Sequence, residues 1–352
     1  MKKNVVLLFG GRSSEYEVSL SSSSGALENI DIEKYDVTKI GITREGGFYL
    51  YEGDVSLISE DRWFEEGKTY PVSLDLAKGV FTADVNGVKR EIKPHAVLPM
   101  IHGKNCEDGK LQGMLALAGI KVAGCGCTSS AVCMDKEFTK AIIRDQTDIP
   151  QAKAVIIRSE DYNAGTAESF RERCEAELGY PMFVKPANAG SSVGVTKVKS
   201  AADFEKAVLN SLHEDEKILV EECIVGCEVE VAVLEEGGKY YAAHPAEIDS
   251  GSSEFYDYET KYISDVSSFY LPARVTEEEQ DKVRAYAVEI FKTLGCRGLS
   301  RVDFFYVGGG KFVFNEINTL PGFTPISMYP KMMINDGISY TELLSRLIEG
   351  AR

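Results

Sequence analysis

Three oxygen-bearing side chains, Asp303, Glu316 and Asn318, stand in a segment whose composition predicts a β-hairpin. Residues 300–307 and 311–318 are rich in Val, Ile, Phe and Tyr, and three glycines separate the two runs. If the last two of these glycines form a two-residue turn, Asp303 lies directly across from Glu316. The three side chains would then converge at one place, which predicts a site for a divalent cation.

On the second strand of this hairpin both oxygen-bearing side chains share one face, because side chains alternate along a strand. Phe312 and Phe314 are expected to continue that face. Burying carboxylates is costly unless a cation compensates. Oxygen ligands favour Mg²⁺ or Mn²⁺ over zinc. The alternatives are a solvated hairpin face, or a carboxylate that pairs with Arg297 or Arg301.

A loop of small residues, Ala187–Val195, is the second feature that predicts chemistry. It follows an expected strand, Met182–Pro186, and combines hydroxyls with residues small enough to expose backbone amides. Such a flap can wrap phosphates, with Lys185 as a point charge at its base. Many loops of this kind are plain hairpin turns, so the residues alone leave both interpretations open.

Composition limits the class of protein. The chain has 352 residues, 44% of them hydrophobic and 27% charged, which is typical of a globular protein of two or three domains. Its formal charge of −16 argues against nucleic-acid and anionic-membrane partners. The apolar run Val5–Phe9 is too short for a signal peptide or a membrane span, so we expect a cytoplasmic protein. Eight scattered cysteines without a C-x-x-C pair indicate reduced thiols.

The elements that position these side chains begin with a strand, Asn4–Phe9, the pair Gly10-Gly11, and a helix from about Val18. That order opens a parallel α/β unit. The glycine pair does not fit G-x-G-x-x-G, which argues against a dehydrogenase-type dinucleotide site. Another buried strand, Ala96–Met100, leads into a loop with His102, and α/β sheets bind ligands in such loops.

Periodicity predicts the remaining elements. Helices are expected over residues 111–118, 131–145, 166–178, 277–294 and 340–348, and strands over 35–42, 120–123, 152–157, 218–222 and 227–234. Residues 47–91 alternate strand-like pieces with polar turns and are the least informative part of the chain. Residues 250–264 are polar and aromatic without a clear period, which favours a functional lid.

Seven separated motifs occur in one order along nearly the whole chain. They are GGRSSEYEVS, HGKNCEDGKLQG, CMDKEFTK, FVKPANAGSSVG, LVEECIVGCEVEVAVL, EFYDYETKY, and GLSRVDFF with NEINTLPGF. In these motifs the chain resembles the ATP-grasp superfamily, and within it the D-alanine–D-alanine ligases. The resemblance implies an α/β fold, α+β in its ATP-binding part, with three domains over residues 1–124, 125–220 and 221–352. The first of these is expected to hold a parallel sheet, and the family suggests a homodimer.

The resemblance also implies a nucleotide site. Lys136 and Lys185 would contact the phosphates of ATP, and Lys261 would reach them from the lid. Glu221 and Glu228 would hold the adenine amino group and the ribose hydroxyls. The matched positions are Lys136, Lys185, Ser191, Ser192, Glu221, Glu222, Ile224, Glu228, Phe255 and Lys261.

The amino-acid and metal sites follow from the same resemblance. Glu15 would take the ammonium of the first D-alanine, with His102 near its carboxylate. Tyr262 of the lid would hydrogen-bond Ser191 and Glu15. The second D-alanine and the developing oxyanion would be surrounded by Arg301, Gly322, Ser327 and Met328. Two Mg²⁺ or Mn²⁺ ions would be bound by Asp303, Glu316 and Asn318, in agreement with the hairpin pattern.

Some positions depart from the family pattern and leave the acceptor open. Tyr16, Cys106 and Glu222 stand where other residues are common, and two motifs are similar to those of D-alanine–D-serine ligases. The apolar Met328 suits a methyl side chain better than a hydroxymethyl one, which favours D-alanine as the acceptor. A different alternative is a nucleotide-binding protein without catalysis. The retained lysines, Arg301 and the metal ligands argue against it.

Overall fold

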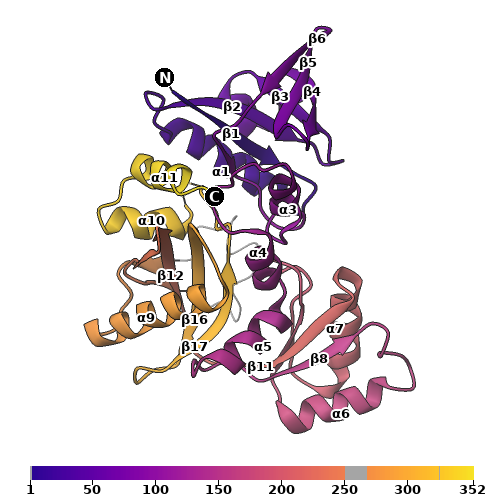
Figure 1. Ribbon diagram of the computed structural model, residues 1–352. Coiled ribbons are helices and arrows are strands. Elements are labelled where there is room, and N and C mark those ends of the chain that lie inside the picture. The colour runs from indigo at the N-terminus through magenta and orange to yellow at the C-terminus, as the bar shows by residue number, and fades with distance from the viewer. Residues whose placement is uncertain (1, 250–267, 325) are drawn as a thin grey trace.

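The computed structural model describes residues 2–249, 268–324 and 326–352, and in it the chain forms three separate β-sheets with helices packed on them (Figure 1). The first sheet uses residues 3–99, the second residues 154–222 and the third residues 227–318. Helix α4 lies between the first sheet and the elements of the second. The predicted boundaries at 124/125 and 220/221 remain predictions.

The first sheet has seven strands in the order β6-β5-β4-β3-β2-β1-β7. The expected parallel part is confirmed, since β2, β1 and β7 pair in parallel. Residues 47–91, where the sequence was least informative, extend this sheet by antiparallel pairing. The strands are β1 (Lys3–Gly10), β2 (Tyr35–Ile42), β3 (Phe48–Glu52), β4 (Lys68–Asp75), β5 (Val80–Val85), β6 (Val88–Ile92) and β7 (Ala96–Pro99).

Small buried residues bring helix α1 close to the ends of these strands. The Gly10 amide donates to Ser19 Oγ over 2.8 Å, and the Ser19 hydroxyl donates to the Met100 carbonyl. The predicted strand 120–123 is wrong, because only the bridge between Val97 and Val122 forms. The helices of this part are α1 (Tyr16–Asn29), α2 (Val55–Ser59) and α3 (Lys110–Leu117).

The helix predicted over 131–145 is two helices, because Asp135 has an extended backbone with ψ 103°. Its carboxylate instead accepts from the Glu137 and Phe138 amides and caps the second helix. Lys136 therefore stands in the first turn of that helix. The elements around the second sheet, ordered β10-β9-β11-β8, are α4 (Cys127–Met134), α5 (Lys136–Gln146), β8 (Ala154–Arg158), α6 (Ala167–Glu177), β9 (Met182–Pro186), β10 (Thr196–Val198), α7 (Ala201–Glu214) and β11 (Lys217–Glu222).

The third sheet has the order β15-β14-β12-β16-β17, and β13 pairs with β12 beside this path. Helix α9 begins with a capping box between Thr276 and Glu279, the start that the sequence predicts. The elements are β12 (Cys227–Glu236), β13 (Lys239–Ala242), β14 (Ala246–Asp249), β15 (Ser268–Tyr270), α9 (Glu277–Thr293), β16 (Leu299–Tyr306), β17 (Phe312–Asn318), α10 (Met328–Asn335) and α11 (Tyr340–Glu349).

The predicted hairpin is β16–β17, and it differs from expectation at its turn. Tyr306 pairs with Phe312, so the loop is longer than two residues, yet Asp303 still lies opposite Glu316. An irregularity next to Asp303 restores that pairing, because Phe304 pairs with Phe314 and Asn315 is an extra residue. A bulge of this kind also interrupts the alternation of side chains along the strand.

Because of that bulge, the prediction for the two faces of β17 is wrong. Phe312 and Phe314 do not continue the face of Glu316 and Asn318 but lie buried in the core with Ile317. The opposite face carries the partly exposed side chains of Glu316 and Asn318. The structure therefore separates the core face of this hairpin from its chemical face.

The first sheet shares its hydrophobic core with the end of the chain. Leu344 and Leu347 of α11 belong to the same buried cluster as Leu7 of β1 and Trp63. Val122 also donates its amide to the Arg352 carbonyl over 3.1 Å. Helices α10 and α11 therefore join the two ends of the chain into one packed unit (Figure 1). No helix in the described part of the chain is long and apolar enough to cross a membrane.

Candidate active site

Two adjoining cavities bring together most of the predicted site residues. The larger cavity, of about 390 Å³, lies between the second and third sheets. The smaller, of about 90 Å³, is lined by the N-terminal part, the third sheet and the segment before α10. Gly190, Ser191 and Glu316 line both. A group bound in one cavity therefore meets a group bound in the other at these three residues.

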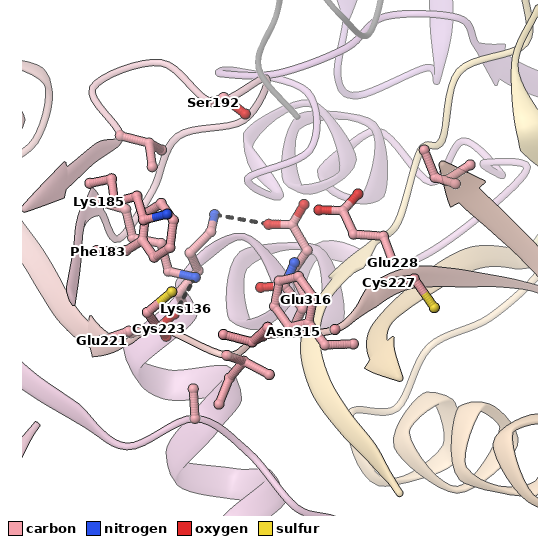
Figure 2. A pocket seen from close by; sticks show the side chains of 18 of the residues that line it. Lys136, Phe183, Lys185, Ser192, Glu221, Cys223, Cys227, Glu228, Asn315 and Glu316 are labelled. Atoms are coloured by element: carbon pink, nitrogen blue, oxygen red, sulfur yellow. Dashed lines mark ion pairs between the residues drawn. The ribbon is translucent and has the colours of Figure 1, made fainter. Parts of the chain in front are cut away.

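Lysines enter the larger cavity from the second sheet and from α5. Lys136 pairs with Glu316 of β17 at 3.6 Å (Figure 2) and donates to the Ala189 carbonyl over 2.8 Å. Lys185 of β9 pairs with Glu221 of β11 at 2.6 Å. Two cations thus face one cavity from different elements, which is an arrangement that suits phosphate groups.

Glu221 is buried beneath this cavity and has two cationic partners. Lys140 lies 2.9 Å from its carboxylate, on the other side from Lys185. Burial opposes ionisation of Glu221, but the two lysines outweigh it and lower the pKa of this carboxyl. Burial also lowers the pKa of the Lys140 ammonium, against the pull of Glu221. The carboxylate is therefore held ionised and in place at the base of the cavity.

The small-residue loop is anchored to the second sheet at its start. The backbone and side-chain amides of Asn188 donate to Asp215 over 2.7 Å and 3.1 Å. Ser191 and Ser192 have positive φ angles of 51° and 58°, which non-glycine residues rarely adopt. Strained backbone of this kind persists where surrounding structure imposes it. The loop forms one wall of the larger cavity with both serines lining it.

The other predicted nucleotide residues line the rim of the same cavity. Ile224 and Glu228 are lining residues, and Glu228 lies on β12 (Figure 2). Glu222 also lines the cavity, although its carboxylate accepts from the Lys153 amide over 2.8 Å. Phe255 and Lys261 lie outside the described residues, as do Tyr262 and the rest of the predicted lid.

The three predicted metal ligands are neighbours on one face of the third sheet. Arg301 donates to both oxygens of Asp303, over 2.8 Å and 2.7 Å, and the Asn318 amide donates to Asp303 over 3.0 Å. Glu316 pairs with Lys136. Among the described residues no three carboxylate, thiol or imidazole groups cluster tightly enough to hold a metal. The third donor here is an amide, however, and the set of hard oxygen donors fits Mg²⁺ or Mn²⁺.

Glu15 and His102 line the smaller cavity. The Ser191 hydroxyl donates to Glu15, which joins the loop of the second sheet to the N-terminal part. His102 lies 2.9 Å from both Ser22 Oγ and the Leu320 carbonyl, and 3.9 Å from Glu107. Burial lowers the pKa of the imidazole, but Glu107, Glu15 and the Leu320 carbonyl outweigh burial and raise it.

A tight loop before α10 completes the smaller cavity. A Cβ atom at Gly322 would lie 2.6 Å from Ser327 Oγ, so a larger residue there would require Ser327 to move. Ser327 accepts from the Thr324 amide over 3.1 Å, and Met328 is the first residue of α10. Gly322, Ser327, Met328 and Arg301 all line this cavity. The described members of the predicted substrate site therefore lie together.

Several lining residues were missed in the sequence, among them Asn315, Glu230, Phe183 and Glu107. Asn315 lines the larger cavity because of the bulge in β17. No local sequence pattern predicts that bulge. Glu230 and Phe183 stand two residues from Glu228 and Lys185, so strand alternation would have placed them on the same faces. Glu107 lies in a loop and carries no such signal.

Three sheets, a cavity lined by lysines and acids, and a smaller cavity beside it agree with the ATP-grasp class of ligases. Family models described as "D-ala D-ala ligase N-terminus" and "D-ala D-ala ligase C-terminus" match residues 4–125 and 143–349. The chain therefore belongs to the D-alanine–D-alanine ligase family, and it is an enzyme of that ATP-dependent class.

Individual relatives cover the whole chain. A D-alanine–D-alanine ligase of Ruminiclostridium cellulolyticum is 44% identical over 99% of this chain and 95% of that protein. The crystal structure of the VanG D-Ala:D-Ser ligase from Enterococcus faecalis is 41% identical, with a TM-score of 0.89 over 99% of each chain. The D-alanine–D-alanine ligase of Coxiella burnetii is 32% identical, with a TM-score of 0.85 over 99% of this chain and 93% of that one.

Proposed function

We propose that the protein joins two D-alanine molecules at the expense of ATP. The observation that carries this proposal is the shared wall of the two cavities at Gly190, Ser191 and Glu316. A nucleotide in the larger cavity would direct its terminal phosphate to this wall. An amino-acid carboxylate in the smaller cavity would meet it there, as phosphoryl transfer requires.

The reaction would run in two steps. The carboxylate of the first D-alanine attacks the terminal phosphorus of ATP, which gives an acyl phosphate and ADP. The amine of the second D-alanine then attacks the acyl carbon, loses a proton and displaces phosphate through a tetrahedral intermediate. Holding the two amino acids side by side removes much of the entropic barrier.

Roles in the first step follow from placement. Lys136 and Lys185 would bind phosphate oxygens in place of their present carboxylate partners. Glu221, Glu222, Glu228 and Ile224 line the part of the larger cavity proposed for adenine and ribose. Asp303, Glu316 and Asn318 would hold two Mg²⁺ or Mn²⁺ ions, which neutralise phosphate charge when bound. Ser191 and Ser192 would donate to the phosphates from the loop, and Phe255 and Lys261 stay predictions.

Roles in the second step concern the smaller cavity. Glu15 would pair with the ammonium of the first D-alanine, and His102 would lie near its carboxylate. The Arg301 guanidinium and the Gly322 amide would donate to the oxyanion. Ser327 and Met328 would contact the second D-alanine, and the apolar Met328 favours a methyl group. Tyr262 stays a prediction because it lies outside the described residues.

The second candidate is ligation of D-alanine to D-serine, which the similarity to VanG favours. ATP-dependent phosphate release is measured with Mg²⁺ and D-alanine, alone and in competition with D-serine or D-lactate. Mass spectrometry then identifies the product. We expect the dipeptide of two D-alanines as the main product, in an amount that the competitors change little. A mixed dipeptide as the main product would instead support ligation of D-alanine to D-serine. No phosphate release with any amino acid would refute both.

Two expectations from the sequence also remain proposals. A homodimer is expected from the family, and light scattering of the purified chain measures its mass in solution. A cytoplasmic location likewise stays a proposal. Neither bears on the chemistry of the two cavities.

A further inference from the structure

Glu230 of β12 is a buried acidic residue of the smaller cavity to which no role has been given above. It is 5% exposed and lies on the strand that also carries Glu228 into the larger cavity. In the sheet register it stands directly opposite Asp303 of β16. Two carboxylates in such a cross-strand pair repel each other unless a cation separates them.

Arg301 supplies that cation. Its Nε atom lies 3.3 Å from Glu230 Oε2, and its Nε and Nη2 atoms donate to Asp303. Both carboxylates therefore lie close to the Nε atom of the guanidinium. Arg301 also lines the smaller cavity, so these contacts fix a cation at the cavity wall.

We propose that Glu230 is a positioning residue, which holds the Arg301 guanidinium at the wall of the substrate cavity. This inference rests on the proposed function, in which Arg301 stabilises the oxyanion and binds the second D-alanine. Asp303 has a second task as a proposed metal ligand. If Asp303 bound a cation, Glu230 would still supply a negative charge beside Arg301.

The alternative is that Glu230 contacts the substrate amine directly. A double-mutant cycle separates the two roles, because a residue that acts only through Arg301 has no further effect once Arg301 is changed. Wild type, Glu230→Gln, Arg301→Lys and the double variant are prepared as full chains. Glu235→Gln is the matched control, because Glu235 is equally buried on β12 but bonds Gly238 and Gly298 away from both cavities.

Three readouts are measured on each variant. Michaelis constants are determined for ATP and for the acceptor D-alanine, and kcat is recorded. Positional isotope exchange in oxygen-labelled ATP reports acyl-phosphate formation without the second step. Thermal unfolding without nucleotide or metal reports the Glu230–Arg301 pair in the free protein.

We expect Glu230→Gln to raise the KM for the acceptor D-alanine roughly 10- to 100-fold and to lower kcat, since a charge-assisted contact is lost. KM for ATP and isotope exchange should stay near wild type. In the Arg301→Lys variant, Glu230→Gln should cause little further change in the KM for the acceptor D-alanine or in kcat. The shifts in Tm of the two single variants should not sum to the shift of the double variant. Glu235→Gln should lower Tm alone.

Wild-type constants in Glu230→Gln, or additive effects in the double variant, would overturn the positioning role. If Glu230→Gln has no cooperative unfolding transition, Glu230→Asp is measured instead, because it keeps the charge on a shorter side chain. A smaller rise in the KM for the acceptor D-alanine is then expected. An unchanged KM in Glu230→Asp would contradict the positioning role. Absence of turnover in the wild type would refute the proposed function instead.

Discussion

Arg301 is the side chain on which the proposed second step depends most. Its guanidinium lines the smaller cavity, and its partners Asp303 and Glu230 fix its orientation. A preorganised oxyanion donor is worth about 10²–10³-fold in rate. Arg301→Ala should lower kcat by about that factor or more, while the protein still unfolds in one cooperative transition.

Glu15→Gln should abolish measurable turnover, because it removes the charge proposed to hold the first ammonium. Glu17→Gln is the control, since Glu17 is exposed and pairs with Arg44 at the surface. Phosphate release over a range of D-alanine concentrations gives both results. Near-normal turnover in Arg301→Ala or in Glu15→Gln would remove that residue from the mechanism.

His102 gives a pH dependence that can be worked out from its surroundings. Its pKa is raised in the folded protein, because Glu107 and Glu15 outweigh the cost of burial. A raised pKa stabilises the fold below the unfolded value of about 6.5, and this contribution is lost as pH rises through the folded pKa. Wild type should therefore lose stability relative to His102→Gln as pH rises above neutrality, as denaturant unfolding at several pH values would measure. A constant difference would contradict this.

The resemblance to the ligase family predicted much of the site. Glu15, His102, Lys136, Lys185 and Glu221 came from separated motifs, and the structure brings them to two adjoining cavities. Their roles are still proposals. The partners of these residues were beyond the sequence, because pairs such as Ser191 with Glu15 join residues far apart in the chain.

At the scale of elements, the cap of α5 links stability to nucleotide binding. Asp135, which directly precedes Lys136, accepts from two amides of the first turn and from Lys217. Loss of an N-cap costs about 1 kcal/mol. Asp135→Ala should cost at least that and raise the KM for ATP, since the turn that carries Lys136 loosens.

Ser339→Ala is the matched control for this prediction. Ser339 caps α11 by accepting from the Glu342 amide over 3.2 Å, and it lines neither cavity. Urea unfolding and initial rates over a range of ATP concentrations should show a similar loss of stability with an unchanged KM. An unchanged KM in Asp135→Ala as well would mean that the cap does not position Lys136.

Elements were predicted best where one pattern runs without interruption. Strand β2 has the predicted bounds of 35–42, and the start of α9 agrees with its capping residues. Failures occurred at single-residue interruptions. Asp135 breaks a helical period, and the extra residue Asn315 reverses the faces of β17. Such breaks depend on tertiary partners, because neither residue is an obligate breaker by itself.

At the scale of the molecule, the shared core predicts that the two ends of the chain unfold together. Leu344 of α11 is fully buried in one cluster with Trp63, the single tryptophan of the chain. Leu→Ala in a core costs about 2–5 kcal/mol. Leu344→Ala should therefore shift the unfolding transition seen by Trp63 fluorescence, although Leu344 lies in the last helix.

Circular dichroism should follow the same shifted transition as the fluorescence of Trp63. The control is Leu209→Ala on α7, where the leucine is 53% exposed and the cost should be small. If Leu344→Ala left the unfolding transition followed by Trp63 fluorescence unchanged, the first sheet would be stable on its own. The predicted boundary at 124/125 would then also mark an independently folding unit.

The common wall at Gly190, Ser191 and Glu316 has a consequence for inhibitor design. An adenosine analogue and a dipeptide mimic joined by a short tether could occupy both cavities at once, since the same three residues line both. The second group would then bind from an effective concentration of about millimolar order. Such a bivalent ligand would gain affinity without any new contact to the protein.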